Sequence, residues 1–140
     1  MRYLRWITLI VGLSLMSVVT GCTQADQVTT SDRSGYSASN NAISASQASK
    51  HIGESKTVCG KVVDSKYSTK SRGAPTFLNF DRPYPSHPFL VVIWGNDRSN
   101  FPSSPERYYL NKEVCVSGLI DSYKGKPQIE AKNKAQVVVK

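Results

Sequence analysis

The sequence contains few residues of the types that catalyse reactions, and they do not cluster. The two histidines, His51 and His87, lie far apart, and the eight acidic residues from Ser49 onward are spread thinly. The sequence has no His-x-x-x-His, no Gly-x-Ser-x-Gly and no phosphate-binding glycine loop. Because an enzyme needs a cluster of acid/base groups, nucleophiles or metal ligands, we predict a protein that is not an enzyme and needs no cofactor or metal.

A different pattern, cations interleaved with aromatic residues, is typical of a binding surface. Single-stranded nucleic acid is held by bases stacking on aromatic rings while Lys and Arg contact the phosphates. From Ser49 onward there are 15 basic and 8 acidic residues, a net charge of +7, which favours DNA or another polyanion as partner, although such a charge can also serve only to keep a domain soluble. The candidate ligand-binding residues fall in four predicted loops: Lys66, Tyr67, Lys70 and Arg72; Arg82 and Tyr84; Trp94 and Arg98; and Tyr123, Lys124 and Lys126.

These loops connect short segments with the residue pattern of β-strands. Val, Ile and aromatic residues that alternate with polar ones predict strands, and Gly and Pro mark the turns between them. Phe77, Phe80 and Phe89 belong to these segments and are expected in the core, whereas Trp94 fits the core or the surface equally well. The predicted strands are 57–66, 76–80, 89–94, 112–121 and an interrupted 128–139, with a short helix over 43–52 and one or two helical turns over 104–109.

This order of elements predicts the fold class. Five short antiparallel strands, a short helix before strand one and a helical turn between strands three and four describe an all-β, five-stranded OB-fold barrel. Gly60, inside the first strand, suggests the bend or bulge that small barrels use to curl. The alternative is a five-stranded SH3-like barrel, which would not need the helical turn.

The amino terminus has the pattern of an export signal. Arg2 and Arg5 precede an apolar run from Trp6 to Val19, which is short for a membrane-spanning helix. The following Val19-Thr20-Gly21-Cys22 resembles the lipobox of bacterial lipoproteins; the alternative is an ordinary signal peptide with an incidental cysteine. The resemblance implies a signal peptide over 1–21, a lipid-carrying (palmitate) Cys22 that anchors the protein to a bilayer, and, with Thr23 next, an outer-membrane location if the host has one.

The predicted export signal is followed by a predicted tether and a predicted domain. Residues 22–42 are mostly small and polar and are expected to form a flexible tether to a domain over 43–140. Cys59 and Cys115 both lie in strand-like sequence, and an exported protein meets oxidising conditions. We therefore predict a Cys59–Cys115 disulfide; the alternative is two separate buried thiols.

The domain also resembles a known family. The similarity covers roughly residues 50–140 and implies a bacterial OB-fold domain of envelope lipoproteins, a domain that also occurs beside nuclease modules in secreted or surface proteins. It rests on His51-Ile52-Gly53-Glu54, Val58-Cys59-Gly60-Lys61-Val62, the segment 73–80, Val92-Ile93-Trp94-Gly95, the segment 114–120 and the segment 123–129.

Two functions remain compatible with these observations. The first is a membrane-anchored lipoprotein whose OB-fold module binds nucleic acid, as single strands or DNA, with little sequence preference. The second is a non-catalytic interaction protein of the bacterial envelope that docks another protein or a glycan, with its charge in a supporting role.

Overall fold

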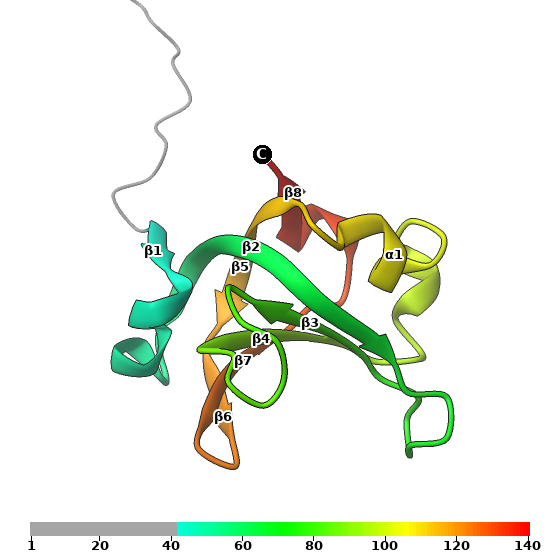
Figure 1. Ribbon diagram of the computed structural model, residues 1–140, viewed down its shortest axis with the longest axis horizontal. Helices are drawn as coiled ribbons and strands as arrows, with labels where there is room; N and C mark the ends of the chain where they lie inside the picture. The colour runs from blue at the N-terminus through cyan, green and yellow to red at the C-terminus, as the bar shows by residue number, and fades with distance from the viewer. Residues whose placement is uncertain (1–41) are drawn as a thin grey trace, which may run out of the picture. The chain divides into compact units, whose positions relative to one another are not determined.

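The computed structural model describes residues 42–140, which form a mainly β unit (Figure 1). The predicted signal peptide, Cys22 and the predicted tether up to residue 41 lie outside the described residues. The strands are β1 (Ala42–Ser44), β2 (Ser55–Tyr67), β3 (Thr76–Phe80), β4 (Phe89–Ile93), β5 (Glu113–Leu119), β6 (Asp121–Tyr123), β7 (Lys126–Glu130) and β8 (Val137–Val139). The helical segments are the 3-10 turns η1 (Ala45–His51), η2 (Arg98–Asn100) and η3 (Lys134–Gln136), and the α-helix α1 (Pro105–Tyr109).

The eight strands form one mixed sheet in the order β6-β7-β4-β3-β2-β5-β8, with β1 beside β2. The β1–β2 and β4–β7 pairs are parallel, and the other pairs are antiparallel. The predicted five-stranded antiparallel barrel is therefore wrong in strand number and in strand direction, although the unit is mainly β. Part of the error lies in the interrupted segment 128–139, which divides into β7, which pairs with β4, and β8, which pairs with β5. The short strands β1 and β6 are two further strands that were not predicted, and β1 adds the second parallel pair.

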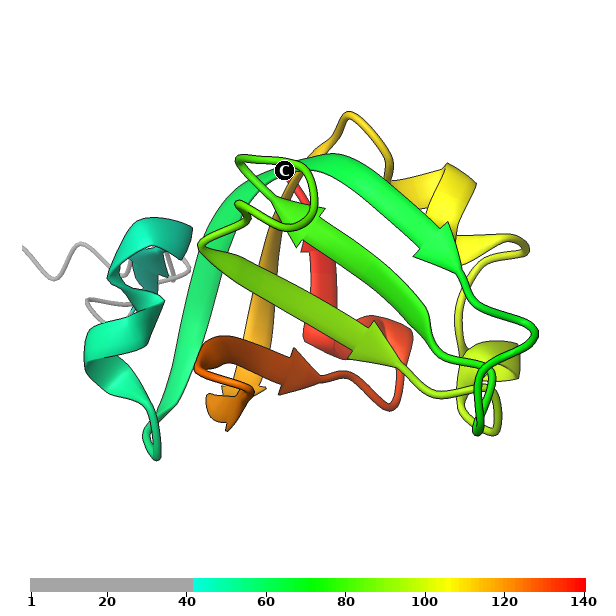
Figure 2. The same cartoon turned by 60° about the horizontal axis from the view of Figure 1, so that its bottom comes forward.

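The long strand β2 holds the two halves of the sheet together. Its first half pairs with β5 and its second half with β3, and its register against β3 shifts between Val62 and Asp64. Figure 1 shows the resulting curvature of β2, and Figure 2 shows β2, β3 and β4 side by side. Gly60 lies before the shift, where an added Cβ would come within 2.9 Å of the Asp81 carboxylate, so a close approach of two segments requires glycine there.

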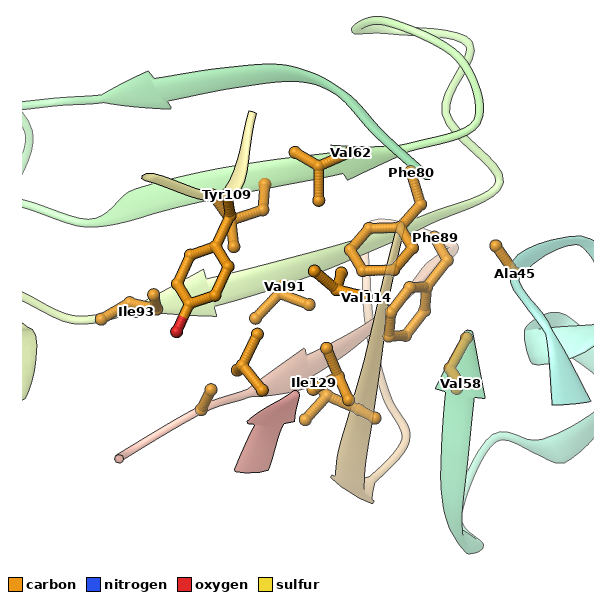
Figure 3. Packing of buried hydrophobic residues seen from close by; sticks show 14 of the residues in the cluster. Ala45, Val58, Val62, Phe80, Phe89, Val91, Ile93, Tyr109, Val114 and Ile129 are labelled. Carbon is orange, nitrogen blue, oxygen red and sulfur yellow. The ribbon is translucent and has the colours of Figure 1, made fainter. Parts of the chain in front are cut away.

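The core is built from buried side chains that β2, β3, β4, β5 and β7 bring together with α1 and η1 (Figure 3). Phe80 and Phe89 meet edge to face, with ring centroids 5.1 Å apart, as expected for core residues. Phe77 differs: it is only partly buried, because it lies on the other face of β3. The segment η1 covers one end of the core with Ala45 and Ala48, in the region where a helix was expected, although it is a 3-10 turn.

The predicted disulfide is confirmed. Cys59 of β2 and Cys115 of β5 are directly paired across the two strands and bonded to each other, with their Cα atoms 4.1 Å apart. The bond closes a loop between residues separated by 56 positions. In the chain-entropy description a loop of this length stabilises the fold by roughly 4 kcal/mol.

Candidate functional site: a basic and aromatic groove

A groove of about 850 Å³ lies on the face of the sheet opposite the core. Its floor consists of residues that alternate with core residues along the same strands: Phe77 and Asn79 flank Leu78 on β3, and Gln128 precedes Ile129 on β7. Its walls are the β3–β4 loop and the β6–β7 turn. The lining residues are Asp64, Ser65, Lys66, Ser68, Phe77, Asn79, Tyr84, Pro85, His87, Leu90, Tyr123, Lys124, Lys126 and Gln128.

Five of the predicted binding residues line this groove together. Lys66 comes from the end of β2, Tyr84 from the β3–β4 loop, and Tyr123, Lys124 and Lys126 from the β6–β7 hairpin. Tyr84 and Tyr123 are 74% and 60% exposed, so both are accessible to a ligand. Two exposed rings and three lysines on one concave surface match the chemistry of a flexible polyanion that carries aromatic groups.

The acidic group in the groove lining, Asp64, holds the wall in place. Its Oδ2 accepts hydrogen bonds from Asn79 Nδ2 at 2.8 Å and from the backbone N–H of Tyr84 at 3.1 Å. The Tyr84 N–H is the main reason that the pKa of Asp64 lies below its usual value, and the Asn79 bond adds to it. The ionised carboxylate therefore fixes the Tyr84 backbone above the groove.

His87 lies buried in the wall under Tyr84. The two rings stack with centroids 5.9 Å apart and planes inclined by 23°. His87 is only 3% exposed, and neither ring nitrogen has a hydrogen-bond partner within the described residues. Burial lowers the pKa of His87, nearby Lys126 lowers it further, and Asp64 partly opposes them, so the imidazole is neutral near pH 7.

The other predicted binding residues do not line this groove. Lys70 and Arg72 are exposed in the β2–β3 loop, and Arg82 is exposed in the β3–β4 loop. Trp94 is 37% exposed and lies against the backbone of Gly73, where an added Cβ would come within 2.9 Å of the indole. Gly73 also has φ of +80°, a conformation that favours glycine. Both this conformation and the close approach of Trp94 therefore require glycine at this position.

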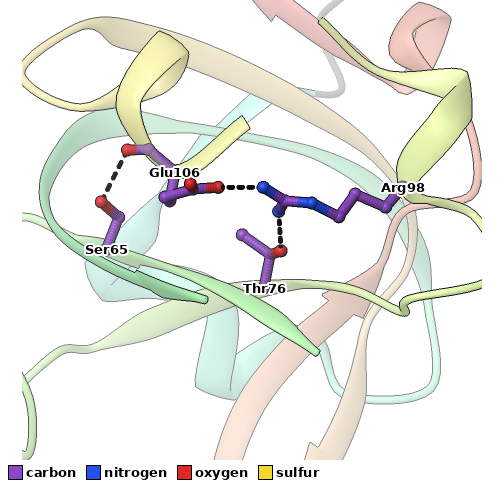
Figure 4. A network of polar contacts seen from close by, with 4 residues as sticks. All are labelled: Ser65, Thr76, Arg98 and Glu106. Atoms are coloured by element: carbon purple, nitrogen blue, oxygen red, sulfur yellow. Dashed lines mark hydrogen bonds and ion pairs between the residues drawn. The ribbon is translucent and has the colours of Figure 1, made fainter. Parts of the chain in front are cut away.

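Arg98 belongs to a separate polar network (Figure 4), and the Tyr67 ring packs against its guanidinium. Arg98 Nη2 lies 2.7 Å from the Glu106 carboxylate, its Nη1 donates to the Thr76 hydroxyl, and its guanidinium stacks 3.7 Å from the centre of the Tyr67 ring. Ser65 Oγ donates to the backbone carbonyl of Glu106 at 2.7 Å. Since both ends of the ion pair are more than four-fifths buried, the network ties α1 to β2 and β3.

The sequence reasoning missed several polar residues of the groove, above all Asp64, His87 and Gln128. Period-two alternation on β3 and β7 was a usable signal for Asn79 and Gln128, because each neighbours a core residue. No comparable signal exists for His87, which lies between two prolines of a loop.

No group of three or more His, Cys, Asp or Glu residues suited to a metal ion occurs within residues 42–140. In the same part of the chain, no helix is long and apolar enough to cross a membrane.

Comparisons with known proteins find little. No protein-family model and no curated protein matches the chain. A crystal structure assigned to an aspartyl-tRNA synthetase from Leishmania major aligns with 77% of this chain and 22% of its own, at 11% identity and a TM-score of 0.49. A similarity this distant carries no argument about function.

Proposed function

We propose that this protein binds single-stranded nucleic acid in the groove, with little sequence preference overall. The observation that carries the proposal is that Lys66, Lys124 and Lys126 share one concave surface with the exposed rings of Tyr84 and Tyr123. The lysines supply contacts to phosphates, and each ring supplies a platform on which a base stacks for about 1–3 kcal/mol. No catalytic role is proposed, since the groove presents no activated nucleophile.

The lipobox-like sequence around Cys22 supports an anchored form of this function. We propose a lipoprotein of the bacterial envelope, held to the bilayer through Cys22 and placed in the outer membrane if the host has one. At that location it would meet DNA outside the cytoplasm.

Binding to a single strand is tested by fluorescence anisotropy with labelled oligonucleotides at 50 and 200 mM salt. A soluble protein of residues 36–140 suffices, because the described residues 42–140 within it have their own hydrophobic core. If three lysines neutralise phosphates, the slope of log affinity against log salt is about −2, and affinity falls about twentyfold between the two salt concentrations.

The triple variant Lys66→Ala, Lys124→Ala, Lys126→Ala is expected to remove this salt dependence and most of the affinity. Its matched control is Lys132→Ala, Lys134→Ala, Lys140→Ala, which removes the same charge from exposed positions outside the groove. Absence of binding at 50 mM salt, or equal losses in the two triple variants, would refute the proposal.

A second function is favoured by one surface feature. Leu119, Val138 and Val139 are 57%, 52% and 37% exposed, and β8 is an edge strand that pairs only with β5 within the described residues. An exposed apolar edge can dock another protein by adding a strand. Under this alternative, charged variants of Val138 abolish partner binding, and the lysine variants do not.

A further inference from the structure

His87 is a buried titratable side chain without a polar partner in the wall of the groove. It is 3% exposed, and neither ring nitrogen has a hydrogen-bond partner within residues 42–140. A neutral imidazole is accommodated there, with its ring stacked under Tyr84. A protonated imidazole carries a charge and two N–H donors, and burying these unpaired is costly. The wall as it stands therefore fits only the neutral form of His87.

The charged groups that face His87 offer a protonated imidazole little compensation. Asp64 of β2 is the carboxylate in the groove lining, and its Oδ2 already accepts hydrogen bonds from Asn79 and from the Tyr84 N–H. Lys126 of β7 places its Nζ 3.4 Å from the His87 carbonyl oxygen. The other titratable groups of the lining are Lys66 of β2, Tyr84 of the same loop, and Tyr123 and Lys124 of the β6–β7 hairpin; Arg82 of the loop is exposed outside the lining. Three lysines against one carboxylate leave the lining positive, which further disfavours the charged form.

The β3–β4 loop, which carries both His87 and Tyr84, can open without the sheet. Residues 81–86 of this loop are exposed. Near His87, two side chains from neighbouring strands hold the loop: Asp64 accepts from the Tyr84 N–H, and Lys126 donates to the His87 carbonyl. A loop with few buried contacts opens at a lower free energy than the whole fold. Opening takes His87 into water, and because the Tyr84 ring rests on the imidazole, Tyr84 leaves its place as well.

We propose that protonation of His87 opens this wall, so that the groove has both of its exposed tyrosine rings in place only while the imidazole is neutral. Opening removes Tyr84 as a stacking platform and leaves Tyr123, which lies on another element. The inference rests on the proposed function and adds a regulation of the same groove by pH. Acidification also adds positive charge, which attracts phosphates, so the contribution of Tyr84 reports the opening and the total affinity does not.

The test measures the contribution of Tyr84 as the ratio of the affinities of wild-type residues 36–140 and Tyr84→Leu for one labelled single-stranded oligonucleotide. Burial holds the pKa of His87 below 6.5 in the closed wall, so the ratio is measured at pH 8 and at pH 5. A general gain of positive charge acts on both proteins and cancels in the ratio. The ratio is expected to be at least about fivefold at pH 8, as for one stacked base, and less than twofold at pH 5.

Two substitutions serve as controls. His87→Phe keeps an aromatic ring under Tyr84 and cannot take up a proton, so in this background the Tyr84 ratio is expected to stay at about fivefold at both pH values. His51→Gln removes the other histidine of the chain, which pairs with Glu54 outside the groove, and is expected to behave as the wild type. Circular dichroism at pH 5 is expected to show an intact sheet in all four proteins.

Three results would overturn the pH-sensitive wall and leave the proposed function in place. The first is a Tyr84 ratio that stays at about fivefold at pH 5 in the wild type. The second is a ratio that falls equally in His87→Phe, because another group would then be responsible. The third is global unfolding of the wild type at pH 5, because the opening would then not be local.

If no strand binds at pH 8, the proposed function fails, and the wall is then tested on the free protein by NMR. The nuclear Overhauser contact between the rings of Tyr84 and His87 is expected at pH 8 and is expected to disappear at pH 5. The same contact in His87→Phe is expected at both pH values. A contact that persists in the wild type at pH 5 would overturn the inference.

Discussion

At the residue scale, the groove combines exposed groups that can bind with buried groups that set its shape. Tyr84 illustrates the arrangement: its ring is exposed, its N–H is held by Asp64, and its inner face rests on His87. Asp64 is itself held by Asn79. A substitution at Asn79 or His87 is therefore expected to change ligand affinity through the position of Tyr84, not through a lost contact with phosphate.

The burial of His87 predicts how stability depends on pH. Because its pKa in the folded protein is lower than the unfolded value of 6.5, the unfolded chain takes up a proton first as the pH falls. Above pH 6.5 the imidazole is neutral in both states and does not lower the free energy of unfolding. As the pH falls from 6.5 toward the folded pKa, the free energy of unfolding decreases. The lowered pKa of Asp64 also makes the free energy of unfolding decrease as the pH falls, but only below the usual carboxyl pKa of 3.8, outside this range.

Urea unfolding of residues 36–140 at pH 8, 6.5 and 5.5 checks this prediction. The free energy of unfolding of the wild-type protein is expected to decrease toward pH 5.5, and His87→Gln is expected to decrease less over the same range. An identical pH dependence in both proteins would show that His87 is not held neutral by burial.

At the scale of secondary-structure elements, the Arg98 network fixes α1 against the sheet. Arg98 was a candidate ligand contact by sequence, but its guanidinium is engaged by Glu106, Thr76 and the Tyr67 ring. Hydrogen bonds to charged, largely buried groups contribute more to stability than neutral ones, because leaving either partner unpaired costs desolvation.

Arg98→Met is therefore expected to lower the free energy of unfolding by about 1–3 kcal/mol and to leave oligonucleotide affinity unchanged. The control Arg107→Met, at an exposed position of α1, is expected to change stability by less than about 0.5 kcal/mol. Urea unfolding and anisotropy on the same samples measure both effects. A loss of affinity in Arg98→Met at full stability would instead make Arg98 a ligand contact.

The sequence predicts the elements of this protein better than their arrangement. Alternation located β3 and β4, and the cysteines predicted the disulfide between β2 and β5. Alternation does not show which strand lies beside which, so the parallel pairing of β7 with β4 could not be predicted from it. The same limit applies to the groove: Tyr84, Tyr123 and the lysines were recognisable by type, whereas His87 became a candidate only through its burial.

At the scale of the whole molecule, charge alone does not define a binding surface. The residues from Ser49 onward carry a net charge of +7, but their lysines and arginines also lie in exposed loops outside the groove and in the Arg98 network. What distinguishes the groove is that three lysines and two exposed tyrosine rings share one concave surface. Salt-dependent attraction can act over the whole unit, but stacking can occur only where rings are exposed.

The most direct test of the central claim is to map the binding surface by amide chemical shifts of labelled residues 36–140 during titration with a short single-stranded oligonucleotide. We predict that the largest shifts occur at Lys66, Tyr84, Tyr123, Lys124 and Lys126, with little change at Arg98 or along β8. Shifts concentrated on the β5–β8 edge, or no shifts at 50 mM salt, would contradict the assignment of this groove to nucleic acid.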